Sequence, residues 1–133
     1  MKRLTLEEAA VFHGHLGPFL TLGYIAGLEA LSIIKANSPF KIEAIVRCPS
    51  RRPYTCFIDG VQCATSCTMG KGNIKMVEDR GLSLELRDAE GKSVVIKVRD
   101  HVIEKIMSMD MSEGVKWVNS RKFNELFIVE QHA

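Results

Sequence analysis

Three short segments with strand character follow one another closely, and they restrict the fold more than any other feature of this sequence. They cover residues 74–78, 82–87 and 93–99. In the last two, every second residue is aliphatic, as in strands with one buried face. The intervening Arg80-Gly81 and Ala89-Glu90-Gly91-Lys92 segments contain the glycine that is typical of hairpin turns. We therefore predict three consecutive strands joined by two hairpins.

Helical patterns surround these strands. In chain order, the remaining pattern predicts a helix over 4–12, a helix over 18–36, a strand over 41–47, a helix from Cys56 onward, and C-terminal helices over 101–109 and 113–121. The order is thus helices, one strand, a helix, three consecutive strands and then helices. It predicts an α+β fold with helices packed on a mixed sheet.

The helix starts have recognisable capping residues. Thr5 precedes two glutamates and is predicted to cap the first helix. Pro18 follows Gly17 and suits the first position of the long helix, where its missing N–H costs nothing. Asp100 and Ser112 are the predicted caps of the C-terminal helices. Asn37-Ser38-Pro39 is expected to end the long helix.

Gly23 and Gly27 lie four residues apart within the long helix and leave a flat strip on its surface. Such a strip allows another element to approach closely. Internal packing is the commoner use, and a contact in a homodimer is the alternative.

Length and composition restrict the class of protein. At 133 residues with 46% hydrophobic residues, the chain is predicted to be one domain over 1–133. Its net charge of +2 and the absence of a basic run argue against nucleic-acid binding. Residues 16–34 contain Glu29, a proline and two glycines, which argues against a membrane span. We expect a cytoplasmic protein whose four cysteines are thiols or ligands rather than disulfides.

The segment 56–73 concentrates the chemically versatile residues. A helix over 56–67 would place on one narrow stripe Cys56, Asp59, Cys63 and Cys67. A separate apolar side would then hold Phe57, Val61 and Ala64. The stripe suits a metal or thiol site, and it equally suits a buried row of cysteines.

Helix geometry limits which cysteines can act together. Cys56 and Cys67 would lie roughly 16 Å apart along one straight helix. They can share an ion only if the helix begins after Cys56 or ends before Cys67. Cys63 and Cys67 could form a redox pair, but a small buried hydrophobe is the simpler interpretation for Cys63 and also for Cys48.

His13-Gly14-His15 lies in the break before the long helix. In extended backbone, alternate residues point the same way, so both imidazoles can reach one ion. Histidine and thiolate together suit zinc or a similar transition metal. Asp59 could ligate directly or orient a ligating histidine. The alternative is one structural and one solvated histidine.

The Thr68-Met69-Gly70-Lys71-Gly72-Asn73 segment follows the cysteine helix. Its glycines allow close backbone approach, and Lys71 could hold a phosphate or carboxylate. A plain helix-ending turn with a surface lysine is the rival interpretation. Three arginines precede the cysteine helix: Arg47, Arg51 and Arg52. If the fold brought their loop close to the loop of Lys71, their positive charges would suit an acidic small-molecule ligand. A solvated surface is the alternative for them.

Two of these segments together resemble the FmdE family, which takes its name from a component of formylmethanofuran dehydrogenase. The segment from His13-Gly14-His15 to Gly27 is similar to its amino-terminal signature. The segment from Cys56 to Gln62 and on through Cys67 to Asn73 is similar to its second signature. The resemblance covers about residues 8 to 100. This sequence lacks the carboxy-terminal zinc ribbon of many members, and some members have cysteine where Gly17 stands and an aliphatic residue where Cys63 stands.

The resemblance implies an α-β-α-β-β-β core with a mixed sheet (FwdE/GAPDH-domain-like). It also implies a bound divalent transition metal, for which zinc is the first expectation and nickel or iron the alternatives. It implies as metal ligands His13, His15, Cys56 and Cys67. Beside them it implies Asp59 and Lys71. We add as further candidates for supporting the metal or contacting a bound molecule Gln62, Cys63 and Asn73. The resemblance also implies a homodimer and a relation to molybdenum or tungsten enzymes of one-carbon metabolism.

Three functions follow as hypotheses. The first is a metal protein with an open metal position beside an anionic ligand at Lys71, whose chemistry would use a polarised carbonyl or an activated water. The second is an accessory module that docks on a larger redox enzyme or carries its cofactor. The third is a thiol redox protein that uses Cys63 and Cys67.

Overall fold

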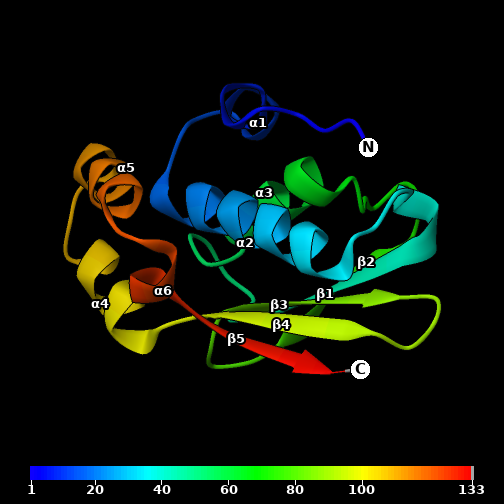
Figure 1. The fold of residues 1–133 in the computed structure, drawn as a ribbon. Helices are drawn as coiled ribbons and strands as arrows, with labels where there is room; N and C mark the ends of the chain where they lie inside the picture. The colour runs from blue at the N-terminus through cyan, green and yellow to red at the C-terminus, as the bar shows by residue number, and fades with distance from the viewer. Residues whose placement is uncertain (133) are drawn as a thin grey trace.

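The computed structural model describes residues 1–132, and its five strands form one mixed sheet in the order β2-β1-β3-β4-β5 (Figure 1). The strands are β1 (Ile42–Cys48), β2 (Ile74–Glu78), β3 (Ser83–Asp88), β4 (Ser93–Val98) and β5 (Phe127–His132). β1 and β2 run parallel, whereas every other neighbouring pair is antiparallel. The α+β class with a mixed sheet is therefore confirmed.

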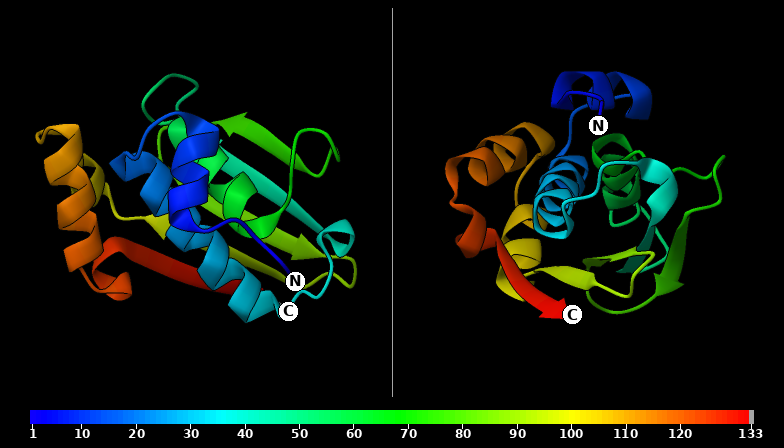
Figure 2. Two further views of the ribbon diagram at one scale, coloured as in Figure 1. Left: turned by 90° about the horizontal axis from the view of Figure 1, so that it is seen from above. Right: turned by 45° about the vertical axis from the view of Figure 1, so that its right-hand side comes forward.

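Six α-helices occur in the described residues. They are α1 (Leu6–His13), α2 (Pro18–Ile34), α3 (Cys56–Thr65), α4 (Asp100–Met107), α5 (Met111–Ser120) and α6 (Phe123–Leu126). A 3-10 turn, η1 (Pro39–Lys41), precedes β1. Helices α2 and α3 cover one face of the sheet, and α1 lies on their outer side (Figures 1 and 2). Helices α4, α5 and α6 gather at one end of the sheet. No described helix has the length and apolarity needed to cross a membrane.

Helices α2 and α3 touch backbone to backbone, which fixes the position of α3. A Cβ atom at Gly23 would lie 2.0 Å from the carbonyl oxygen of Phe57, and one at Gly60 would lie 2.2 Å from that of Leu20. Only glycine fits at either position. Gly27 likewise faces Ala64. The glycine strip of the long helix thus serves internal packing, as the commoner interpretation predicts.

The main core lies between this helix pair and the sheet. The predicted apolar side of α3, consisting of Phe57, Val61 and Ala64, is fully buried. From the sheet, alternate residues of β3 and β4 enter the same core: Leu84, Leu86, Val94, Ile96 and Val98. These packed faces leave the two ends of α3 at opposite edges of the helix layer.

The predicted helix starts are partly confirmed. Thr5 caps α1 and forms a capping box with Glu8, and Pro18 begins α2. The predicted caps at Asp100 and Ser112 are wrong. Asp100 is already the first residue of α4, and Asp110 caps α5 because its carboxylate accepts the N–H of Glu113, at 2.9 Å.

The predicted hairpin at Arg80-Gly81 is also wrong, whereas the turn that contains Gly91 (φ 93°) joins β3 and β4 as expected. β1 lies between β2 and β3. It is buried along most of its length and therefore needs a neighbour on each edge, whereas β2 is largely exposed and suits the edge of the sheet. The last strand, β5, and the short helix α6 were not predicted, because the sequence patterns indicate no element after residue 121.

Candidate functional site

A chain of hydrogen bonds links the end of α1 to the first half of α3. The Nδ1 atom of His13 lies 2.6 Å from Oδ2 of Asp59. The other Asp59 oxygen accepts from the amide nitrogen of Gln62 at 3.1 Å, and the Gln62 oxygen accepts from the N–H of Met69 at 3.1 Å. An ionised carboxylate only accepts, so Nδ1 of His13 is the donor in this contact, and Nε2 is the ring nitrogen outside it.

Glycines shape the turn that presents the two histidines. Gly14 ends α1 in the left-handed region, with φ 110°, and reverses the chain between them. The ring centroids of His13 and His15 lie 4.8 Å apart in an edge-on arrangement. A Cβ atom at Gly17 would lie 3.3 Å from Cε1 of His15, so any larger residue there would press on this ring. The predicted proximity of the two imidazoles is present.

Cys56 lies beside this pair, at the first position of α3. It lines a cavity of about 170 Å³ together with His15 and Pro53. Burial raises the pKa of the Cys56 thiol, the Asp59 carboxylate raises it further, and Arg52 opposes the rise. The structure thus gathers one carboxylate, two imidazoles and one partly buried thiol: Asp59, His13, His15 and Cys56.

Cys63 lies about two helical turns after Cys56 on the same stripe of α3, and it is buried. It packs in a small cluster with Ala9, Tyr24 and Ala64. Burial, and then the Asp59 charge, raise the pKa of its thiol to about 11. A protonated thiol packed among apolar side chains agrees with the interpretation of Cys63 as a small buried hydrophobe. Cys48 is similar: it is fully buried, and burial, with Glu78 and Asp79, raises its pKa to about 11.

Cys67 lies beyond the far end of α3, which stops at Thr65. It is fully buried in the main core. Burial raises the pKa of its thiol, while a hydrogen bond with Thr65 and the charge of Lys71 oppose the rise. The carboxylate that acts on it is Glu43 of β1, whereas Cys56 and Cys63 experience Asp59. The structure therefore separates Cys67 from the histidine pair.

The glycine loop after α3 has a clear structural task. The Asn73 amide donates to the carbonyls of Pro39 and Ile42, at 2.7 and 3.3 Å, and its oxygen accepts from the N–H of Thr68 at 2.9 Å. Lys71 is exposed and donates to the Thr68 hydroxyl at 3.0 Å. Asn73 thus ties the loop to the start of β1, and Lys71 lies at the opposite end of α3 from the histidines.

The three arginines do not lie around one common site. Arg47 pairs with Glu85 on the sheet, at 2.8 Å. Arg51 lies over the ring of Tyr54, at 5.0 Å from its centroid. Arg52 is the one whose charge acts on Cys56. Of the three arginines, Arg52 is therefore the one that acts on the candidate site.

Sequence reasoning missed three methionines that line the same cavity as His15 and Cys56: Met107, Met109 and Met111. Their alternate spacing in Met-Ser-Met-Asp-Met is visible in the sequence. Only the packing of α5 beside the start of α2 reveals that they face the histidine turn. There, Gly114 of α5 lies against Pro18, since a Cβ added to it would be 3.0 Å from the proline ring.

The imidazoles of His13 and His15 and the thiol of Cys56 are suitable ligands for a transition metal, although their arrangement in the described residues does not form a complete metal site. Within residues 1–132, no three or more histidine, cysteine, aspartate or glutamate side chains converge on one point suited to a metal ion. His13 and His15 are nevertheless adjacent, and Cys56 shares a cavity with His15. A soft to borderline ion suits imidazole and thiolate ligands.

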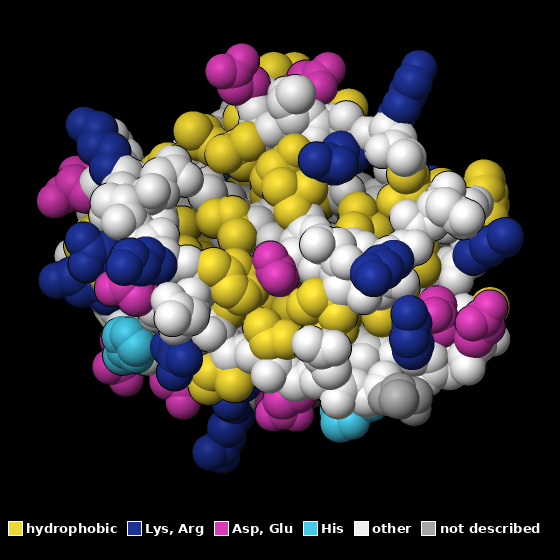
Figure 3. All heavy atoms as spheres, in the orientation of Figure 1, with side chains coloured by type: hydrophobic (Ala, Val, Ile, Leu, Met, Phe, Trp, Pro, Cys, Tyr) yellow, Lys and Arg dark blue, Asp and Glu magenta, His cyan; other side chains and the backbone are white. Residues whose placement is uncertain are grey.

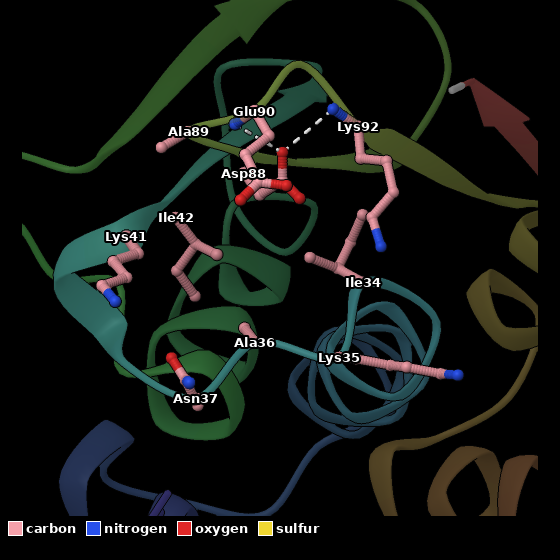
Figure 4. A pocket seen from close by; sticks show the side chains of 10 residues that line it. All are labelled: Ile34, Lys35, Ala36, Asn37, Lys41, Ile42, Asp88, Ala89, Glu90 and Lys92. Carbon is pink, nitrogen blue, oxygen red and sulfur yellow. Dashed lines mark hydrogen bonds between the residues drawn. The ribbon is translucent and has the colours of Figure 1, made fainter.

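A second cavity, of about 270 Å³, lies between the end of α2 and the β3–β4 hairpin (Figure 4). Lysines and acids both line it, and Lys35 extends away from the acidic side chains. The Asp88 carboxylate already accepts the N–H groups of Glu90 and Lys92, both at 2.9 Å. Its mixed charges select no ligand class, and we assign it no function.

Comparison with known proteins gives two matches. A family model described as "FmdE, Molybdenum formylmethanofuran dehydrogenase operon" matches residues 12–127. A protein of Archaeoglobus fulgidus named "Probable S-adenosyl-L-methionine-binding protein" is 32% identical over an alignment of 115 residues that covers 81% of this chain and 30% of that protein. The chain thus spans less than a third of the length of this curated relative.

Proposed function

This chain belongs to the FmdE family, and we propose that it is a metal-binding member that holds a divalent transition metal through His13, His15 and Cys56. Zinc is the first expectation, and nickel or iron the next. Because the family description refers to a molybdenum formylmethanofuran dehydrogenase operon, we further infer a cytoplasmic role in one-carbon redox metabolism that depends on molybdenum or tungsten.

The contact between His13 and Asp59 is the observation that carries the proposal. Metal-ligating histidines usually donate their second ring N–H to a carboxylate, which fixes the ring and makes the other nitrogen a better ligand. The 2.6 Å contact at Nδ1 has this form. Asp59 is itself held by Gln62.

The residues around the turn define what the site can do. When bound, a divalent metal supplies Lewis acidity toward a carbonyl oxygen or water. Asp59 keeps the proton on Nδ1 of His13 and so orients its Nε2. The cavity beside His15 is lined mostly by apolar side chains, among them Phe19 and Ile106. A small, largely apolar molecule would fit this space.

An accessory role is the second candidate, and exposed apolar surface favours it. Val11 and Phe12 on α1 are 84% and 59% exposed, and Leu16 in the following turn is 41% exposed. Figure 3 shows hydrophobic side chains gathered over the face of the molecule formed by the helices. Surface of this kind suits docking on a second copy or on a larger redox enzyme.

Metal analysis tests the proposal. Untagged protein would be reconstituted with zinc, nickel or iron and its metal content measured by mass spectrometry for wild type, His13→Ala, His15→Ala and Cys56→Ala. His101→Ala, which removes an exposed histidine of α4, is the matched control. Cys67→Ala tests the remaining ligand that the family resemblance implies.

We expect near-stoichiometric metal in wild type, His101→Ala and Cys67→Ala, and loss of metal in the other three variants, with circular dichroism unchanged. A wild-type protein that takes up no metal after reduction and reconstitution overturns the proposal. Loss of metal in Cys67→Ala alone would move the site to the other end of α3 and contradict the assignment to Cys56.

A further inference from the structure

Three methionines border the cavity beside the histidine turn, and we call them the methionine rim: Met107, Met109 and Met111. Met107 is the last residue of α4, Met109 lies in the connection that follows, and Met111 is the first residue of α5. Met107 and Met111 are 48% and 49% exposed. Their thioethers are thus accessible from solvent, although the cavity that they border is otherwise apolar.

The rim lies close to the proposed metal ligands. A Cβ atom placed on Gly17 would be 3.3 Å from Cε1 of His15 and 3.7 Å from Cγ of Met111. The imidazole and the methionine therefore flank the same glycine. Cys56 lines the cavity as well. One small space thus holds thioether, thiol and imidazole groups from three separate parts of the chain.

The chemistry of this lining is uniformly soft. Sulfur ligands from cysteine and methionine select Cu(I), whereas carboxylate and carbonyl oxygens suit magnesium, calcium and manganese. None of the described residues that line this cavity is an aspartate or a glutamate. Asp59 reaches the site only through His13, with which it shares the 2.6 Å contact.

We propose that this cavity also binds Cu(I), held by Cys56 and His15 together with thioethers of the methionine rim. The inference rests on the proposed function in that His15 and Cys56 are metal ligands. It adds thioether ligands that the proposed function does not use, and it names a second class of ion.

An ordinary apolar surface is the rival explanation for the rim, since methionine also fills irregular binding surfaces. Replacement by leucine separates the two. Leucine keeps the volume and the apolar character of methionine but has no donor atom. An apolar surface tolerates this change, whereas a thioether ligand set does not.

The experiment uses the reduced, untagged full chain under anaerobic conditions. Cu(I) affinity is measured by competition with a chromophoric Cu(I) chelator, and zinc affinity by competition with a fluorescent zinc chelator. The test variant combines Met107→Leu, Met109→Leu and Met111→Leu. The matched control combines Met69→Leu and Met76→Leu, which are exposed methionines outside the cavity.

We expect both wild type and control to bind Cu(I). The rim variant should lose Cu(I) affinity by about tenfold or more while its zinc affinity and circular dichroism stay unchanged. Single Met109→Leu should show part of the loss.

Two failures are distinguishable. Zinc binding that depends on His15, together with Cu(I) affinity unchanged in the rim variant, overturns this inference and leaves the proposed function standing. A wild-type protein that binds neither ion overturns both.

Discussion

The polar groups at the start of α3 are partly exposed and can bind a ligand, whereas those that follow its end are buried or already hydrogen-bonded within the protein. At the start, Cys56 and Asp59 are partly exposed, and the histidine turn beside them has one imidazole nitrogen free of the Asp59 contact. At the end, Cys67 is fully buried, and the Asn73 amide bridges the loop to Pro39 and Ile42. One continuous sequence signature, from Cys56 to Asn73, therefore serves two different tasks.

The difference shows that some residues of one motif can serve a ligand site while others hold the fold together. Ten helical residues separate the two ends, about 15 Å along the axis. This length is too great for both ends to contact one small ion. The start of α3 instead meets the histidine turn, and its end meets β1. The α2–α3 packing holds both ends in place.

Substitution of the shared scaffold should have the largest effect. Gly23→Ala would drive a Cβ into the Phe57 carbonyl, at 2.0 Å, and separate α2 from α3. We expect a loss of about 3 kcal/mol in the free energy of unfolding and a reduced metal content, because both ends of α3 shift. Urea unfolding measures the loss. Gly70→Ala, which meets nothing within 4 Å, should stay within about 0.5 kcal/mol of wild type. Equal stability of the two variants would contradict the helix contact.

Asn73→Ala should damage only the end of α3. It removes three hydrogen bonds to partly buried backbone groups. We expect the free energy of unfolding to fall by about 2 to 3 kcal/mol, since each bond contributes about 1 kcal/mol. Metal content should not change. Thermal unfolding and metal analysis, with the exposed Asn37→Ala as control, check both outcomes. Loss of metal in a folded Asn73→Ala protein would show that the two ends are not independent.

The buried thiols predict a loss of stability at high pH. Burial raises the pKa of Cys48 and of Cys63 from 9.0 to about 11. Between these values the unfolded chain has released these protons and the folded chain retains them, so stability falls as pH rises from 9 to 11. We expect about 2 kcal/mol per thiol. Urea unfolding across this interval measures it, and the double variant Cys48→Ala/Cys63→Ala should show a shallower slope. An unchanged slope would mean that other groups cause the loss.

Asp59→Asn should have the smallest effect on folding and a selective effect at the start of α3. The His13–Asp59 contact is partly exposed, so its loss should lower the free energy of unfolding by less than about 1 kcal/mol. Metal affinity should fall by about 10- to 100-fold, because the carboxylate orients the ligating imidazole. Competition with a metal chelator measures this change. Asp79→Asn, on the loop before β3, is the matched control and should bind metal as wild type does.

Features that depend on near neighbours in sequence were predictable. The Thr5 cap, the Gly17-Pro18 helix entry and the apolar side of α3 each arise from residues within a few positions of one another. The resemblance to the FmdE family also depends on linear motifs, and the family match confirms it. The proximity of the two histidines follows from the single glycine between them.

Contacts between distant segments required the tertiary structure. A turn signal at Arg80-Gly81 cannot reveal that β1 will lie between β2 and β3, because that order depends on hydrogen bonds between strands far apart in the chain. No element was predicted after residue 121, yet 127–132 completes the sheet, since β4 otherwise has a free edge.

The sequence by itself determined the class of the fold, the starts of α1 and α2 and the identity of the chemically versatile residues, because these depend on local geometry and composition. Only the tertiary structure decided which of those residues meet. It placed Cys56 beside His15, buried Cys67 at the other end of α3 and brought the methionine rim to the same cavity. The reason is physical: ligand sets are assembled by the packing of segments far apart in the chain, and no local pattern specifies that packing.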